Sequence, residues 1–111
     1  MYKVIMLDNY LDSAKAEIYE KECATLEEAE EAYEGLFEQA KTLILEVLKL
    51  LAKADEEQAH VIMQIIDVVS ELELNEEIEL NSGDSRFLLV EKNHIEFSLA
   101  GKHIIGKIGE V

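Results

Sequence analysis

The sequence predicts one α+β domain over residues 1–111, with an N-terminal β-hairpin, a two-helix hairpin whose first helix is long, and a C-terminal antiparallel β-meander. The spacing of the apolar residues carries this prediction. They alternate near the N-terminus, recur every three or four residues through the middle, and alternate again after Leu74. The length of 111 residues fits one domain, and the hydrophobic fraction of 49% supports a buried core rather than disorder.

Two strands are expected before the first helix. Residues 2–7 are rich in β-forming side chains and predict the first strand, which a polar loop at 8–13 then ends. Residues 15–22 alternate, with Ala16 and Ile18 on one face and Glu17 and Tyr19 on the other. This alternation predicts the second strand of a hairpin.

A capping box opens the first helix, which is expected to span 26–53. Thr25 can accept a hydrogen bond from the amide of Glu28, and the Glu28 carboxylate can reach back toward the cap. The apolar residues that follow are spaced four and three residues apart, which is a heptad pattern. They are Ala29, Tyr33, Leu36, Ala40, Leu43, Val47 and Leu50.

A second helix is expected after a tight link at 52–54. Asp55 is its predicted N-cap, and Gln58 stands three residues later. The residues expected to face the core are Ile62, Ile65, Ile66 and Val69.

The length of the first helix predicts an oligomer. A continuous helix over 26–53 would be about 42 Å long, whereas a compact domain of this size is roughly 35 Å across. Either the helix breaks near Gly35, or its overhanging part packs on another chain. The broad apolar surface after residue 42 favours a homo-oligomer, most simply a homodimer. The interface is predicted at Leu43, Val47, Leu50 and Leu51.

The C-terminal third predicts a meander of four strands. The first is expected at 77–80, the second at 86–91 with both faces apolar, and the third at 94–99 with Ile95, Phe97 and Leu99 inward. Turns are predicted at 81–84, 92–93 and 100–102. The last strand, 103–108, is weakened by Gly106 and Gly109.

Charge is the outstanding compositional feature. The chain has 25 acids and 10 lysines and arginines, a formal net charge of −15. Residues 17–38 hold nine acids against Lys21 alone, and residues 54–85 hold ten acids and no lysine or arginine. Such a field repels DNA, RNA and anionic membranes, and it attracts basic proteins and cations.

The two acidic runs are the candidate partner-binding residues. Acids at helical spacings of three and four lie ~5–6 Å apart, and duplex DNA carries one charge per ~1.7 Å of axis. The first run could therefore imitate phosphates, although a solvated helix face is the simpler explanation. The candidates are Glu27, Glu30, Glu31, Glu34, Glu38, Glu73, Glu76, Glu77 and Glu79.

No enzyme, metal site or cofactor is predicted. The chain lacks HExxH, GxSxG, GxxxxGK[ST] and GxGxxG motifs, and the acidic run after residue 70 lacks the pattern of an EF-hand loop. Cys23 stands alone among acids, so we expect a packed strand residue rather than a catalytic thiol. A lone cysteine and an apolar run of only four residues before Asp8, too short for a signal peptide, predict a cytoplasmic protein.

The charge profile resembles that of small acidic inhibitors from phage and mobile elements that mimic nucleic acid, including anti-restriction and anti-CRISPR proteins. The resemblance covers composition only and carries over no residue role. It implies a non-enzymatic inhibitor that occupies the basic, nucleic-acid-binding surface of a partner protein, for example a nuclease. The alternative is a homo-oligomeric structural or adaptor protein whose acids only confer solubility.

Overall fold

The computed structural model describes residues 1–10 and 16–110 and confirms the predicted α+β class. Its two helices are α1, Leu26–Ala54, and α2, Ala59–Ser70. Its six strands are β1 (Tyr2–Tyr10), β2 (Ala16–Cys23), β3 (Ile78–Ser82), β4 (Ser85–Glu91), β5 (His94–Leu99) and β6 (Lys102–Glu110). The predicted hairpin, helix pair and meander all form.

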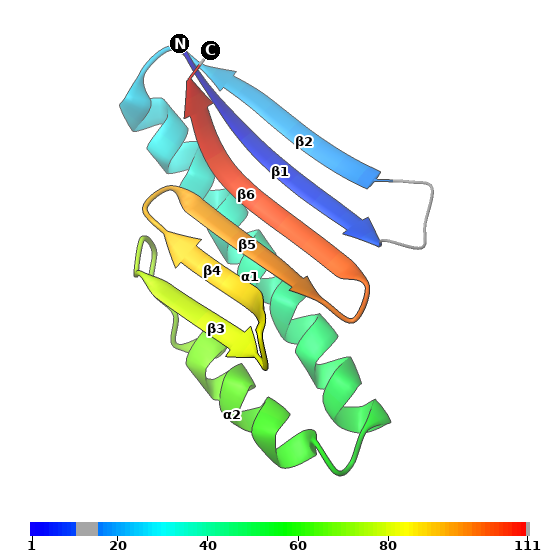
Figure 1. Ribbon diagram of the computed structural model, residues 1–111. Helices are drawn as coiled ribbons and strands as arrows, with labels where there is room; N and C mark the ends of the chain where they lie inside the picture. Colours follow the sequence, from blue (N-terminus) through cyan, green and yellow to red (C-terminus); the bar gives the residue numbers. More distant parts are fainter. Residues whose placement is uncertain (11–15, 111) are drawn as a thin grey trace.

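One antiparallel sheet contains every described strand, in the order β2-β1-β6-β5-β4-β3. The last strand pairs with the first, from Tyr2 opposite Glu110 to Tyr10 opposite Lys102. The meander therefore adds onto the N-terminal hairpin, and the two ends of the chain lie side by side (Figure 1). Because β2 and β3 are the two outer strands, α1 and α2 must carry the chain from one edge of the sheet to the other.

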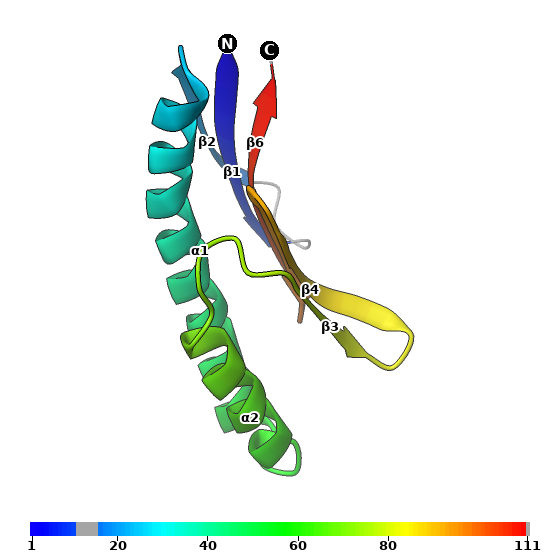
Figure 2. The same cartoon turned by 90° about the vertical axis from the view of Figure 1, so that its left-hand side faces the viewer.

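Both helices lie on the same face of the sheet (Figure 2). α1 crosses β2, β1, β6 and β5 and is continuous through Gly35 over 29 residues, about 44 Å. The molecule measures 48 × 32 × 23 Å, so the helix fits along its long axis. The alternative of a break near Gly35 is therefore wrong. The C-terminal end of α1 runs past the sheet and packs on α2 (Figure 2).

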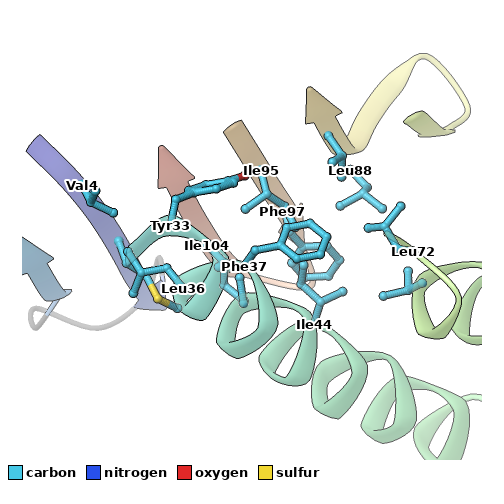
Figure 3. Packing of buried hydrophobic residues seen from close by; sticks show 14 of the residues in the cluster. Val4, Tyr33, Leu36, Phe37, Ile44, Leu72, Leu88, Ile95, Phe97 and Ile104 are labelled. Atoms are coloured by element: carbon cyan, nitrogen blue, oxygen red, sulfur yellow. The ribbon is translucent and has the colours of Figure 1, made fainter. Parts of the chain in front are cut away.

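The core lies between α1 and the middle strands. Tyr33 and Phe37 of α1 point at Ile95 and Phe97 of β5 and at Ile104 of β6 (Figure 3). A Cβ atom at Gly106 would meet Ile95 Cγ2 of the neighbouring strand at 3.2 Å, whereas Tyr33 Cε2 of α1 would lie at 3.9 Å, an ordinary contact distance. The glycine that seemed only to weaken β6 thus leaves room for the Ile95 side chain.

The buried stripe of α1 departs from the predicted heptad. Ala29, Tyr33, Leu36 and Ala40 are buried as expected, but Leu50 is 64% exposed. Residues that repeat every seven positions shift by about 20° around the axis of an α-helix with each repeat. After three heptads the predicted stripe has moved away from the sheet. The residues that remain buried further along are Ile44 and Leu48.

Several element boundaries differ from the prediction. The capping box is confirmed, since the Glu28 amide donates to Thr25 Oγ1 at 3.2 Å and the Glu28 carboxylate accepts from the Ala24 amide. Asp55 caps a turn rather than α2 directly, because its carboxylate accepts from the Gln58 amide and the helix starts at Ala59. Residues 8–10 belong to β1, so the loop predicted at 8–13 is wrong there, and its remainder lies outside the described residues.

A bulge explains the apolar run in β4. The pairing of β3 with β4 shifts between Leu80 and Asn81, so that Leu80 opposes Leu88 while Asn81 opposes Arg86. Phe87 is the extra residue, and it is buried beside Leu88. Two consecutive apolar side chains can therefore face the helices, where strict alternation would have exposed one of them.

We predict that Tyr33→Phe stabilises the protein by about 1 kcal/mol at pH 8. The Tyr33 hydroxyl is buried and has no hydrogen-bond partner among the described residues, so its removal relieves a desolvation penalty. Burial also raises the pKa of Tyr33 above its ordinary value. The unfolded chain therefore ionises first as the pH rises above about 10, and the wild type loses stability there.

Urea denaturation at pH 8 and at pH 10.5 measures both effects. The gap between Tyr33→Phe and the wild type should widen at the higher pH. Tyr19→Phe is the control, because Tyr19 is exposed and its change should leave stability within about 0.5 kcal/mol. A Tyr33→Phe protein less stable than the wild type at both pH values would contradict the prediction.

Candidate functional site

The acidic run of α1 forms a row along one side of the helix. At about 100° per residue, Glu27, Glu31, Glu34 and Glu38 fall within a sector of roughly 60°. All four are exposed, and Glu30 beside them is half-buried. The buried stripe of α1 lies about 120° away from this row. The sheet thus fixes which side of the helix presents the carboxylates.

No acid of this row belongs to an ion pair within residues 1–10 and 16–110. The ion pairs found there join Lys3 to Glu20, Lys102 to Asp8, and His94 and His103 to Glu96. From Glu27 to Glu38 the helix rises about 16 Å. The four carboxylates of the row therefore follow one another about every 5.5 Å along the axis, against one charge per ~3.4 Å along one DNA strand.

The start of the second acidic run lies beside the end of the α1 row. Lys41 of α1 donates from Nζ to the carbonyl oxygen of Leu72 at 2.8 Å. Lys41 follows Glu38 by three residues, so this bond places the segment after α2 next to the end of the α1 row. Figure 2 shows that segment running from α2, past the middle of α1, to the sheet.

Within the second run, one carboxylate has a structural role. Glu76 accepts from the Glu73 amide at 3.1 Å and so stabilises the turn between α2 and β3. Asn75 supports the same turn by accepting from the Asn93 amide at 2.9 Å. Glu73, Glu77 and Glu79 are exposed, with no ion pair in the part of the chain that the structure describes. Glu79 pairs with Leu89, which pairs with Glu96, so the Glu79 side chain lies on the open face of the sheet. We name the α1 row and the acids before β3 the acidic side. Its members are Glu27, Glu30, Glu31, Glu34, Glu38, Glu73, Glu76 and Glu77.

The residues predicted for an oligomer interface cluster at the C-terminal end of α1. Val47, Leu50 and Leu51 line a shallow apolar groove of about 230 Å³ together with Ala54 and Ala100. Leu43 is half-buried and does not line it. The ion pair between Lys102 and Asp8 lies at the edge of this groove, and Lys102 is itself buried.

The exposure of α2 was not predicted. Of its apolar residues only Ile66 and Val69 are buried, whereas Ile62 and Ile65 are half-buried. Val61, Met63 and Val68 are 51%, 52% and 42% exposed. The signal was present in the sequence, since apolar residues occur all around this helix although it packs on one neighbour.

A histidine–glutamate–histidine group on the open face of the sheet was also missed. Glu96 Oε2 lies 3.6 Å from His94 Nε2, and Glu96 Oε1 lies 3.4 Å from His103 Nε2. Alternation had placed His94 and Glu96 on one face, but His103 joins them only through the β5–β6 register, which sets Ser98 opposite His103. None of the grooves found among the described residues is lined by this group.

Within the described ranges, no group of His, Cys, Asp and Glu is arranged to hold a metal ion. Neither α1 nor α2 combines the length and the apolarity that crossing a bilayer would require. Comparison with protein-family models, with curated proteins and with solved structures found no match.

The acidic row should lower the stability of the protein at low salt. Like charges three and four residues apart on a helix repel by about 0.2–0.5 kcal/mol per pair. Replacing Glu27, Glu30, Glu31, Glu34 and Glu38 by glutamine should raise the free energy of unfolding by about 1 kcal/mol in 10 mM salt. Because salt screens exposed charges, the gain should shrink in 0.5 M salt. Urea denaturation at both salt concentrations measures this gain. A loss of stability at low salt would show that the repulsion between these carboxylates is offset by favourable contacts of the same residues.

Proposed function

We propose that this protein is a non-enzymatic inhibitor that binds the basic, nucleic-acid-contacting surface of a partner protein through its acidic side. One observation supports the proposal above the others. The start of the second acidic run lies beside the end of the α1 row although the two are distant in sequence, and no acid of either belongs to an ion pair among the described residues. A surface of this charge suits a partner evolved to bind phosphates.

The helix provides the rigidity that such imitation needs. Carboxylates on a helix of 29 residues packed along a sheet keep their spacing, whereas acids in a flexible tail would have to be ordered on binding. Many charges would contact the partner together, so affinity should fall steeply with salt. Nucleases and other nucleic-acid-binding proteins present the complementary surface.

The decisive experiment combines capture with competition. The immobilised chain is incubated with a native cell lysate, and the column is eluted with duplex DNA. Partners of the proposed kind should elute, since DNA competes for the same surface. The chain with Glu27, Glu30, Glu31, Glu34 and Glu38 replaced by glutamine should bind the purified partner at least tenfold more weakly, about 1.4 kcal/mol.

A control variant with the same net charge keeps this test specific. Replacing Glu20, Glu46 and Glu110 by glutamine removes three exposed charges away from the acidic side, and its counterpart of equal net charge replaces Glu31, Glu34 and Glu38 by glutamine. This control should bind the purified partner within about threefold of the wild type. If both variants lost the same affinity for the partner, net charge alone would explain the binding, and the imitation of nucleic acid would be refuted.

The alternative proposal, a homo-oligomeric structural or adaptor protein, is favoured by the exposed apolar end of α1. Leu50 beside Val47 and Leu51 leaves apolar surface open to water. Sedimentation equilibrium at micromolar concentration should then give at least twice the chain mass of 12.6 kDa. Val47→Glu should convert the oligomer to monomers, because it places a charge in the interface. A monomer mass for the wild type would remove this alternative.

A further inference from the structure

α2 is attached to the rest of the fold along one side only. It packs on α1, and no Cα atom of α2 lies within 8 Å of a Cα atom in any described strand. The same holds between α1 and strands β3 and β4. Figure 2 shows the β3–β4 hairpin diverging from the two helices, and residues of α2 and of this hairpin line a groove between them.

This groove is apolar and has a volume of about 260 Å³. Its main apolar contributors are Leu51, Val61, Ile62, Ile65, Phe87 and Leu99. A cavity of about 150 Å³ is enough for a benzene ring, so the groove has room for one or two apolar side chains.

An apolar ridge continues from the groove along α2. Val61, Ile65 and Val68 follow one another at spacings of four and three residues, so they lie on one side of the helix. This is the pattern by which one helix packs against another. The ridge extends over about 10 Å, which matches two turns of a partner helix.

Acidic residues flank both ends of the ridge. Asp55, Glu56 and Glu57 precede α2, whereas Glu71 and Glu73 follow it, and all five are exposed. Lys53 and Arg86 are the nearest bases in the sequence on either side, and residues 54–85 contain none. A segment that fills the ridge must therefore place its own charges beside carboxylates.

We infer that the groove and ridge bind a basic amphipathic helix of the partner protein. Its apolar row inserts beside Val61, Ile65 and Val68, and its lysines and arginines meet the acids at the two ends of α2. α1, α2 and the bound helix then form a three-helix layer. Because this helix belongs to the basic partner proposed above, the docking mode rests on the proposed function and adds an apolar anchor to it.

A second copy docking through its own α2 does not suit the ridge, because two α2 helices packed together would bring the acidic ends of one copy against those of the other. Like charges brought together in this way oppose association. Anionic lipid headgroups are disfavoured for the same reason. The apolar end of α1 is the other surface that a second copy offers, and the sedimentation measurement below tests it.

Synthetic peptides of 18 residues test the docking mode. The probe carries leucines at i, i+4, i+7 and i+11 on an alanine, lysine and arginine background. A scrambled peptide keeps its composition but has no apolar face. In fluorescence anisotropy at 150 mM salt, the probe should bind the full chain at least tenfold more tightly than the scrambled peptide does. Equal binding of the two would overturn the inference, since charge alone would then explain it.

Two variants locate the site. Val61→Ser with Val68→Ser should weaken probe binding at least tenfold, and both positions are exposed enough for the fold to be kept. Met63→Ser is the matched control, because Met63 is equally exposed but lies on the opposite flank of α2. It should change probe binding less than twofold. Equal effects of the two changes would overturn the ridge as the site.

Two further measurements separate this inference from the proposed function and from self-association. The variant with five glutamines on α1 should keep probe binding within threefold even if it loses the DNA-competing partner. If this variant loses the partner but still binds the probe, both proposals are supported. If it still binds the partner, the imitation of nucleic acid is refuted, but the docking of a helix on α2 is not. If the wild type sediments as a dimer that the Val61→Ser, Val68→Ser variant dissociates, a second copy occupies the ridge and the inference is wrong.

Discussion

The packing of α1 across the sheet is the constraint on which the rest of the structure depends. β2 and β3 are opposite edges of one sheet, so the chain between them has to cross a whole face. A helix of 29 residues makes that crossing and buries Tyr33, Phe37, Ile44 and Leu48 against it. Burial of each such side chain contributes about 1.5–3 kcal/mol, so this one contact supplies much of the core. It also fixes the rotation of the helix, and therefore the direction in which its carboxylates point.

The same packing leaves part of the molecule incompletely covered. α1 covers β2, β1, β6 and β5, but it does not reach β3 and β4, and α2 packs on α1 rather than on the strands. The apolar residues of α2 and of the bulged β4 strand therefore meet across a groove instead of in a closed core. The turn that Lys41 holds lies beside the acidic row, whereas Leu51 near the end of α1 lines the groove. Other acids flank α2 at that groove, so charge and apolar surface occur together there, as at interfaces where ionic contacts steer the encounter and apolar anchors hold the complex.

Local sequence patterns were enough to predict the order and type of every element. The change from alternation to helical spacing located the helices, the capping box marked the start of α1, and His94–Leu99 formed the strand that its alternation predicted. Properties that depend on tertiary arrangement were not predictable in the same way. The heptad pattern could not show which of its residues the sheet covers, and Leu50, predicted to lie in an oligomer interface, is exposed in the single chain. The position of His103 beside Glu96 depends on strand register, and the exposure of α2 depends on how far β3 and β4 curve away.

The central claim is that the side bearing α2 and the acidic residues is the contact surface, and the open face of the sheet is not. Amide chemical-shift mapping of the labelled chain, titrated with the purified DNA-competing partner, tests it most directly. We expect the largest shifts at residues 27–38, 61–68 and 71–77, with little change at His94, Glu96 and His103. Shifts centred on those three residues, with the acidic side unaffected, would contradict the claim.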